Sequence, residues 1–443
     1  NLSIKSHLAS GVPGTVAGLA EAHQRYGKLS WRELVQPAID LALNGFTLTE
    51  SEASGLNYIQ KALQENNTII PAFLIRDWHA GDSIRYVDLG RTLERIRDYG
   101  ADGFYTGKTA DDIVAEMDRG NGLISHEDLN AYQPIWRDPV VGTYKGYKVF
   151  SMPPPSSGGV ALLQLLNMVE TFDVGQLGHN TAASIHLFTE AQRRVYADRA
   201  SYLGDPAYYP VPVEQLIDKN YCNDRMTSFD PYRATPSASV REGVIPGRES
   251  TETTHLSVID QHGNAVAVTT TLNGSYGSRI VVAGSGFLLN NEMDDFSVKP
   301  GHANLYGAIG GEANKIEPAK RMLSSMTPTI LEKEGKLFMV LGTPGGTSII
   351  TSVFQTIMNV VDFKMKMQDA VAAKRIHSQW LPDEILMERD AMNSTELKQL
   401  ETMGHQIKLL DGQLGRVDAI LVRPDGKLEA GADPRGDDTA IGY

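Results

Sequence analysis

Threonine hydroxyls gather near the middle of this chain, at residues 253–254 and 269–271. A threonine hydroxyl is a weak nucleophile until a base removes its proton, and a free α-amine on the same residue can be that base. An acidic, loop-like stretch at residues 248–252 runs straight into Thr253. A cut between Glu252 and Thr253 would therefore create an N-terminal threonine that carries both nucleophile and base.

An internal threonine has no such amine, because its nitrogen is part of an amide, so the chain would first have to cleave itself. The hydroxyl of Thr253 would attack the carbonyl of Glu252, form an ester and be released by water. Residues 206–252 are rich in Pro, Asp, Ser and Gly and have little apolar periodicity, so we expect a loop that can be cut. This predicts a large subunit, residues 1–252, and a small catalytic subunit, residues 253–443.

The elements around Thr253 can be predicted from apolar spacing. Residues 255–259 and 265–272 alternate and flank Asp-Gln-His-Gly-Asn, a pattern typical of two antiparallel strands joined by a short turn. The first half of the chain has the three- and four-residue spacing of amphipathic helices. Those helices are expected at residues 15–26, 31–43, 51–64, 88–97, 109–118 and 180–203. In the second half we expect strands at residues 329–332, 336–341 and 419–422 and a helix at residues 348–361.

Five motifs occur in order along the chain. They are Thr-Thr-His-Leu-Ser-Val at residues 253–258, Asp-Gln-His-Gly-Asn-Ala-Val-Ala-Val-Thr at 260–269, Leu-Leu-Asn-Asn-Glu-Met-Asp-Asp-Phe at 288–296, Leu-Ser-Ser-Met-Thr-Pro at 323–328 and Gly-Thr-Pro-Gly-Gly at 342–346. With these motifs, residues 6–443 closely resemble the γ-glutamyltranspeptidases (glutathione hydrolases), which belong to the N-terminal nucleophile hydrolases.

The resemblance implies an α+β fold, a four-layer αββα sandwich of the N-terminal nucleophile hydrolase type. The chain starts without a methionine and resembles a point inside the family's large subunit. We therefore expect the N-terminal part of the fold to be missing, with its signal sequence and an arginine that grips the substrate α-carboxylate. The family implies a periplasmic or secreted location, although this chain has no signal-peptide core and no apolar run of membrane-spanning length.

The resemblance also assigns roles to particular residues. Thr253 would be the nucleophile and Thr271 would orient it, while the amides of Gly345 and Gly346 would form the oxyanion hole. Arg375 and Arg435 resemble positions tied to maturation at Glu252 and Thr253, although either could be a structural ion-pair partner. The substrate-binding residues implied are Asn273, Glu292 and Asp295 for the α-amino group, Ser324 and Ser325 for the α-carboxylate, and Tyr306 in a lid over the pocket.

The reaction that follows is γ-glutamyl transfer from glutathione or another γ-glutamyl compound, through an ester on Thr253, to water or to an amino acid or peptide amine. No cofactor is needed, and no metal, because the sequence has no His/Cys cluster of ligand spacing. A net charge of -13 argues against nucleic acid as a partner. A single cysteine, Cys222, excludes a disulfide within the chain.

Three alternatives remain open. A glutaryl or cephalosporin acylase of the same superfamily would leave Glu292 and Asp295 without the ammonium group that they suit. A hydrolase of poly-γ-glutamate is disfavoured by the apparent lid, which fits a small substrate better. An unprocessed, inactive scaffold would bind γ-glutamyl compounds without turning them over.

Overall fold

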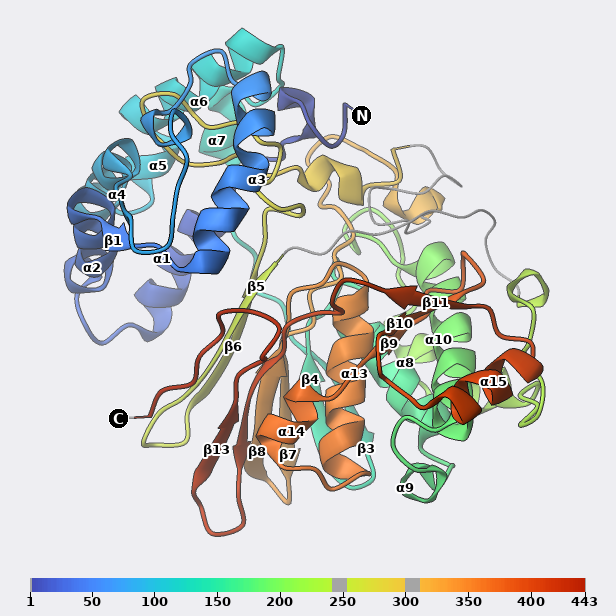
Figure 1. Ribbon diagram of the computed structural model, residues 1–443. Helices are drawn as coiled ribbons and strands as arrows, with labels where there is room; N and C mark the ends of the chain where they lie inside the picture. Colours follow the sequence, from blue (N-terminus) through green and yellow to red (C-terminus); the bar gives the residue numbers. More distant parts are fainter. Residues whose placement is uncertain (1, 241–252, 299–310, 443) are drawn as a thin grey trace. The chain divides into compact units, whose positions relative to one another are not determined.

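The computed structural model describes residues 2–240, 253–298 and 311–442 (Figure 1). The chain divides into two units. Unit 1 comprises Asn1–Trp136 and Leu272–Asp294, and unit 2 comprises Arg137–Thr271 and Asp295–Tyr443. Of the residues proposed above for the site, Glu252 and Tyr306 lie outside the described ranges.

Unit 1 is helical, as the apolar spacing predicted. Three of its helices begin with a capping box, in which a Ser or Thr side chain and the acidic side chain three residues later each accept a hydrogen bond from the other's backbone N–H. Residues 272–294 return to this unit and contribute Ile280, Val282 and Leu289 to a core with Ile113 and Met117. Its elements are α1 (Thr15–Tyr26), α2 (Trp31–Asn44), β1 (Phe46–Thr47), α3 (Glu50–Asn66), β2 (Ser83–Ile84), α4 (Val87–Tyr99), α5 (Asp102–Tyr105), α6 (Gly107–Gly120) and α7 (His126–Ala131).

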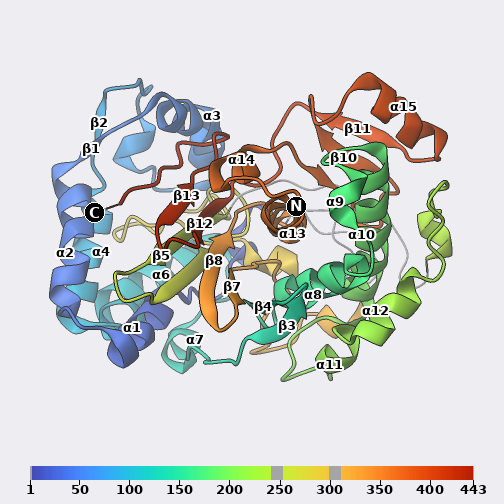
Figure 2. The same ribbon diagram turned by 90° about the horizontal axis from the view of Figure 1, so that it is seen from below.

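Unit 2 contains a six-stranded sheet in the order β13-β12-β8-β7-β4-β3, in which all neighbours are antiparallel (Figure 2). In the register, Val149 lies opposite Leu331, and Leu331 lies opposite Met339. The strands are β3 (Val140–Tyr144), β4 (Tyr147–Ser151), β7 (Thr329–Lys333), β8 (Lys336–Gly342), β12 (Asp418–Val422) and β13 (Leu428–Gly431).

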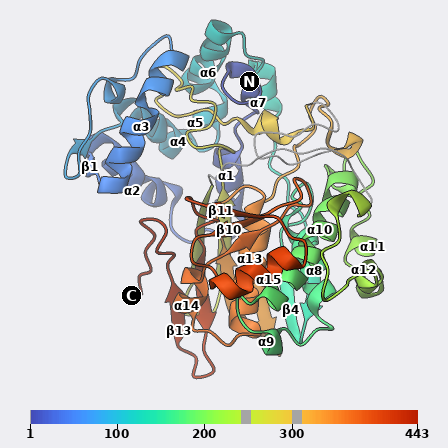
Figure 3. The same ribbon diagram turned by 45° about the vertical axis from the view of Figure 1, so that its right-hand side comes forward.

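Helices α8 (Gly158–Val169), α13 (Ser348–Val361) and α14 (Met367–Ala372) cover one face of this sheet, and α10 (Ala182–Tyr202) packs on α8. Every residue of α8 and of α13 is buried, so both helices are central to the core. Beside α10 lies a second, small sheet of β9 (Ile376–His377), β10 (Ile385–Glu388) and β11 (Ile407–Leu410), together with α15 (Ser394–Thr402) (Figure 3).

The hairpin β5 (Thr254–Ile259) and β6 (Ala265–Thr270) forms another sheet layer in unit 2 and packs against β8 and β12. Met339 and Leu341 belong to the core under the helices. Because neighbouring residues of a strand point to opposite faces, Gly342 faces away from that core, and His255 of the hairpin packs there. Unit 2 therefore stacks helices, a sheet and a second sheet, which confirms the α+β class.

One expectation for unit 2 was wrong in part. Residues 206–252 were expected to form a loop, but they contain α11 (Val213–Leu216) and α12 (Lys219–Met226). The Asp218 side chain caps α12 by accepting from the backbone N–H of Tyr221 at 2.9 Å. Only Cys222 and Met226 of α12 are buried, which explains why apolar periodicity did not reveal it. None of the helices in the described ranges is both long and apolar enough to span a bilayer.

Candidate active site

Thr253 stands directly before β5, at the open end of the β5–β6 hairpin. At the closed end, the Asp260 side chain accepts from the backbone N–H groups of His262 and Asn264 at 2.8 and 2.9 Å, which fixes the turn. The resulting register pairs Thr254 with Thr270. Thr253 and Thr271 are the next residues in line, and their Oγ1 atoms lie 3.3 Å apart. The predicted nucleophile and its predicted orienting residue are therefore neighbours.

His255 anchors the hairpin to the sheet beneath it. Its Nδ1 and Nε2 atoms lie 2.9 Å from the Thr269 hydroxyl and 3.0 Å from the Ser257 hydroxyl. Burial lowers the pKa of His255 to about 4, so the imidazole is neutral at pH 7. A side chain at Gly342 would overlap this ring, so the glycine provides the space that the histidine fills. This anchor holds the strand that begins one residue after Thr253.

The glycine turn between β8 and α13 contains both residues predicted for an oxyanion hole. Gly345 and Gly346 have φ values of 142° and 56°, a left-handed region that only glycine adopts readily. The Ser348 hydroxyl donates to the Gly345 carbonyl at 2.6 Å, and the buried Tyr196 hydroxyl donates to the Thr347 carbonyl at 2.5 Å. Among the described residues, neither glycine N–H donates to a protein acceptor. The turn can therefore offer two fixed amide donors to a developing negative charge.

The two predicted carboxylate-binding serines are held by residues 153–157, the proline- and serine-rich segment after β4. The backbone N–H of Ser157 donates to the Ser324 carbonyl at 2.8 Å, and the N–H of Ser324 donates to the Pro155 carbonyl at 2.9 Å. The Ser156 hydroxyl donates to the Met326 carbonyl at 2.7 Å. Ser324 and Ser325 themselves are partly exposed. The backbone of Ser324 is therefore held at both its N–H and its carbonyl, while Ser324 and Ser325 remain partly exposed residues.

Arg375 and Arg435 lie in a closed network of four buried charges. Arg375 Nη2 lies 2.7 Å from Asp433, and Arg435 bonds Asp433 at 2.9 Å and both carboxylate oxygens of Glu388 at 2.7 and 2.5 Å. Despite burial, these ion pairs hold the pKa values of Glu388 and Asp433 below their ordinary values. The alternative that both arginines are structural ion-pair partners is supported by this geometry.

The charge network reaches the glycine turn through residues 414–417. Arg375 Nη1 donates to the Leu414 carbonyl at 2.9 Å, and the backbone N–H of Val417 donates to Asp433 at 2.8 Å. The N–H of Arg416 donates to the Thr343 hydroxyl at 2.8 Å, two residues before Gly345. Loss of either arginine would therefore disturb the backbone that supports the predicted oxyanion hole. This is a physical way in which the two arginines could affect maturation.

The residues predicted for the α-amino group fall in different units. Asn273 and Glu292 belong to unit 1, where Asn273 Nδ2 donates to the Asn291 carbonyl at 3.0 Å and the Glu292 N–H donates to Asn290 Oδ1 at 3.0 Å. Asp295 belongs to unit 2, and its carbonyl accepts from Asn314 Nδ2 at 2.7 Å. Each unit thus holds its part of the predicted set in a hydrogen-bonded turn.

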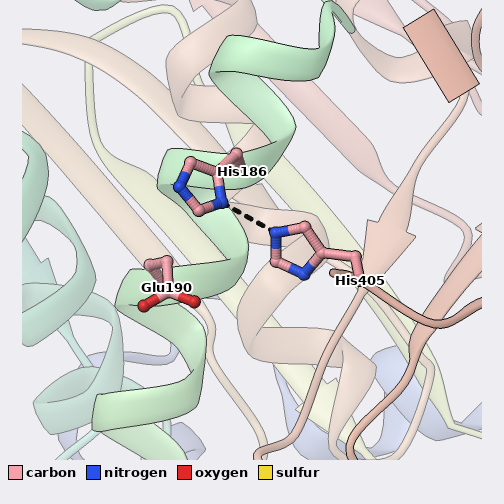
Figure 4. A group of neighbouring side chains, drawn as sticks. All are labelled: His186, Glu190 and His405. Carbon is pink, nitrogen blue, oxygen red and sulfur yellow. Dashed lines mark hydrogen bonds between the residues drawn. The ribbon is translucent and has the colours of Figure 1, made fainter. Parts of the chain in front are cut away.

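A second group of chemically capable side chains lies in unit 2, outside the set predicted from sequence. His186 and Glu190 are one turn apart on α10, and with His405 they offer three buried ligand atoms within 4.8 Å of one another (Figure 4). Such a triad could in principle bind a metal ion. No local pattern in the sequence predicts this triad, because His405 is 219 residues from His186 and the only local signal is a His and a Glu four residues apart.

The hydrogen bonds of this triad do not favour a metal. His186 Nδ1 and His405 Nε2 lie 2.7 Å apart and bond each other. The Glu190 oxygens already accept from the Thr235 N–H at 3.0 Å and from Arg194 at 2.8 Å. A cation would have to displace these donors beside buried Arg194, so we interpret the group as an anchor between α10 and the segment before β11.

Proteins of one family resemble this chain over its full length. Residues 1–443 match the protein family described as Gamma-glutamyltranspeptidase. The Glutathione hydrolase proenzyme of Pseudomonas aeruginosa is 46% identical over 442 residues, covering 98% of this chain and 78% of that protein. The one from Escherichia coli (strain K12) is 44% identical over 445 residues, covering 100% of this chain and 76% of that protein. The Acylase ACY 1 proenzyme of Pseudomonas sp. (strain SE83) is more distant, 34% identical over 98% of this chain and 75% of that protein.

Among solved structures, a cephalosporin acylase from Bacillus halodurans is 27% identical, with a TM-score of 0.85 over 99% of this chain and 80% of that chain. This likeness confirms the α+β sandwich of the N-terminal nucleophile hydrolases. The family match over the full length, with relatives at 44% and 46% identity, shows that this chain belongs to the γ-glutamyltranspeptidase family of enzymes.

Proposed function

We propose that this chain cleaves itself between Glu252 and Thr253, and that the new N-terminal Thr253 then transfers γ-glutamyl groups from small donors such as glutathione. The observation that carries the proposal is the 3.3 Å approach of the Thr253 and Thr271 hydroxyls at the end of a register-fixed hairpin. A hydroxyl beside the nucleophile can orient its proton and lone pairs, as nucleophilic catalysis by threonine requires.

Maturation and turnover would use the same atoms. In maturation, Thr253 Oγ1 attacks the carbonyl carbon of Glu252, the peptide C–N bond breaks, and water hydrolyses the resulting ester. In turnover, the freed α-amine of Thr253 takes the proton from Oγ1, which attacks the γ-carbonyl of the donor. The amides of Gly345 and Gly346 stabilise the tetrahedral oxyanion. The leaving amine takes the proton, and a γ-glutamyl ester remains on Thr253.

Water or the amine of an amino acid or peptide then attacks this ester, which releases glutamate or a new γ-glutamyl compound. The donor would be recognised by its α-carboxylate through Ser324 and Ser325 and by its α-ammonium through Asn273, Glu292 and Asp295. Carboxylates and a carboxamide are suitable acceptors for an ammonium group. The proposed location of the mature enzyme is periplasmic or secreted, and the proposed assembly is one large with one small subunit.

The test begins with the intact mass of the purified chain and of its Thr253→Ala variant. We expect the parent to yield two chains, the smaller beginning at Thr253, and the variant to remain whole. A parent that stays as one chain and turns over no γ-glutamyl anilide would overturn the proposal in favour of the inactive scaffold.

The choice of substrate distinguishes the proposed γ-glutamyl transfer from the acylase alternative. A γ-glutamyl anilide and a glutaryl anilide differ only in the α-amino group, which a glutaryl acylase does not need. We expect the γ-glutamyl anilide to be turned over much faster than the glutaryl anilide. In the glutaryl complex, Glu292 and Asp295 would have no ammonium group to bind. Faster turnover of the glutaryl anilide would assign the chain to the acylases instead.

A further inference from the structure

Arg199 connects the core of unit 2 to the predicted carboxylate site. It lies on α10, is only 5% exposed, and its Nε and Nη2 atoms donate to the hydroxyls of Ser157 and Ser325 at 2.9 and 3.0 Å. The Ser157 hydroxyl in turn donates to the Ser324 carbonyl at 2.7 Å. A buried guanidinium is thus joined directly to one of the two serines and indirectly to the other.

These bonds fix the direction in which the Ser325 hydroxyl can act. A guanidinium can only donate hydrogen bonds, so Ser325 Oγ must be the acceptor in its bond with Arg199. The hydroxyl proton of Ser325 must then point away from Arg199. Ser325 is partly exposed, so a ligand outside the protein core can approach this residue. A serine held in this way acts toward a ligand as a hydrogen-bond donor, which is what an anionic ligand requires.

The charge of Arg199 adds to this effect. A positive charge one hydrogen bond behind Ser325 polarises its O–H bond and favours an anion in front of it, and burial strengthens the interaction. Ser157 keeps the guanidinium in place, because it accepts from Nε while donating to the backbone of Ser324. The arrangement provides positive potential at a carboxylate site without direct contact between arginine and ligand.

We infer that Arg199 is a positioning residue for the donor's α-carboxylate, which acts by fixing and polarising the Ser325 hydroxyl, with Ser157 as its support. This inference rests on the proposed function, since it assumes that Ser325 meets a substrate carboxylate. It goes beyond that function by assigning the carboxylate selectivity to a buried residue 126 positions away in the sequence.

The test compares two donors that differ only in the α-carboxylate, γ-glutamyl p-nitroanilide and 4-aminobutyryl p-nitroanilide. Arg199→Met is expected to raise KM for the first donor roughly 10- to 100-fold, with a much smaller change in kcat, because Ser325 loses the charge-assisted hydrogen bond that fixes and polarises its hydroxyl. The second donor should be nearly unaffected. Arg199→Lys should recover part of the loss, and Ser157→Ala should give a smaller loss of the same kind.

A matched control is Arg194→Met. Arg194 is also on α10 and is 1% exposed, but its bonds go to Glu190, Ser228 and the Arg225 carbonyl. This variant should be less stable and yet keep the parent's preference between the two donors. A double variant, Arg199→Met with Ser325→Ala, should lose no more carboxylate preference than Ser325→Ala alone.

The outcomes are distinguishable. If the parent turns over the γ-glutamyl donor and Arg199→Met raises KM for both donors by the same factor, Arg199 is only structural and the inference is wrong. If the losses of carboxylate preference from Arg199→Met and Ser325→Ala add up in the double variant, the inference is also wrong. If Arg199→Met fails to fold, the ratio of KM values for the two donors is measured in Arg199→Lys and Ser157→Ala, and it tests the inference in the same way. A parent that turns over neither donor overturns the proposed function and this inference with it.

Discussion

The Oγ1 atoms of Thr253 and Thr271 lie 3.3 Å apart, because the register of the β5–β6 hairpin brings its two open ends opposite each other. Thr271→Val keeps the shape of the side chain and removes its hydroxyl. We expect self-cleavage to slow and kcat of the mature enzyme to fall roughly 10- to 100-fold with KM nearly unchanged, since an orienting hydrogen bond is lost. Intact mass over time and steady-state kinetics with γ-glutamyl p-nitroanilide measure both effects.

The matched control for this prediction is Thr270→Val. Thr270 is the neighbouring residue, is exposed, and as a strand residue points to the other face of the hairpin. It should leave cleavage and kcat unchanged. Equal losses in the two variants would mean that the hairpin, rather than the Thr271 hydroxyl, is what both substitutions disturb.

Gly342 provides the space for the His255 ring, so Gly342→Ala should disturb the hairpin beneath Thr253. An added methyl group in a packed site costs about 1 to 3 kcal/mol, and we expect a loss of unfolding free energy in that range together with slower cleavage. Urea unfolding of the variant in a Thr253→Ala background measures the stability without interference from processing. Gly412→Ala is the control, because a methyl group there would meet no atom within 4 Å. A stable, normally cleaved Gly342→Ala would contradict the role of the anchor.

Arg435 forms two bonds with Glu388, and both groups are largely buried. Removal of one partner of a buried ion pair leaves the other charge uncompensated, at a cost of about 3 to 5 kcal/mol. We therefore expect Arg435→Met to lower the unfolding free energy by roughly that amount, again measured by urea unfolding in the Thr253→Ala background. Because the network supports residues 414–417 behind the glycine turn, cleavage of the otherwise unaltered chain should also slow.

Arg389→Met is the comparison for this variant. Arg389 pairs with Asp411 at the surface, where both side chains are mostly exposed. Such a pair contributes about 1 kcal/mol or less, so this variant should unfold almost as the parent does. If Arg435→Met is no less stable than Arg389→Met but is cleaved slowly, Arg435 would act in maturation itself and not through the stability of the fold.

The sequence predicted the parts of this molecule that depend on local periodicity. Alternation and turn residues predicted the β5–β6 hairpin, and the hairpin register accounts for the approach of Thr253 and Thr271. The amphipathic helices of unit 1 were expected within a few residues of their bounds. Short strands such as β9, with two residues, are too brief for any period to reveal.

Contacts that join distant parts of the chain could not be predicted in this way. Arg199 and Ser325 are 126 residues apart, and no local pattern relates an arginine on a helix to a serine in a loop. The same holds for Arg435 and Glu388, which are 47 residues apart. Such pairs follow from the packing of α10 and of residues 433–435 in unit 2, which only the folded chain reveals.

Acid should destabilise the anchor between α10 and the segment before β11. Burial and the charge of His186 lower the pKa of His405 to about 4, against 6.5 for the unperturbed side chain. As the pH falls from 7 towards 4, the unfolded chain takes up a proton that the folded chain does not, so stability falls by up to about 1.4 kcal/mol per pH unit. The pKa values of the neighbouring acids Glu190 and Asp383 are lowered in the folded chain, so as the pH approaches 4 these groups add to the same loss of stability.

His405→Gln removes this titration while retaining a polar side chain. We expect the variant to melt below the parent at pH 7.5, because the 2.7 Å bond with His186 is lost or weakened, and the difference in Tm to shrink at pH 5. Thermal melts of the Thr253→Ala background at both pH values measure it. A difference that stays constant with pH would mean that the imidazole is not what responds to acid.

The opposite dependence of folding stability on pH is expected at Asp418, at the start of β12. Burial, and then the charges of Asp438 and Asp433, raise the pKa of Asp418 to about 7, against an ordinary value of 3.8. Among the described residues, its Oδ1 atom is buried and has no hydrogen-bond partner. Between pH 4 and pH 7 the folded chain therefore keeps a proton that the unfolded chain has released, and stability falls as the pH rises through this range.

Asp418→Asn replaces the carboxyl by a neutral group of the same shape at every pH. We expect the variant to melt at a higher temperature than the parent at pH 8, where Asp418 would otherwise be charged beside two other carboxylates, and the two Tm values to converge at pH 5. Asp425→Asn, on the exposed turn between β12 and β13, is the matched control and should show no such dependence. A parent that melts above Asp418→Asn at pH 8 would mean that the ionised carboxylate stabilises this end of the sheet.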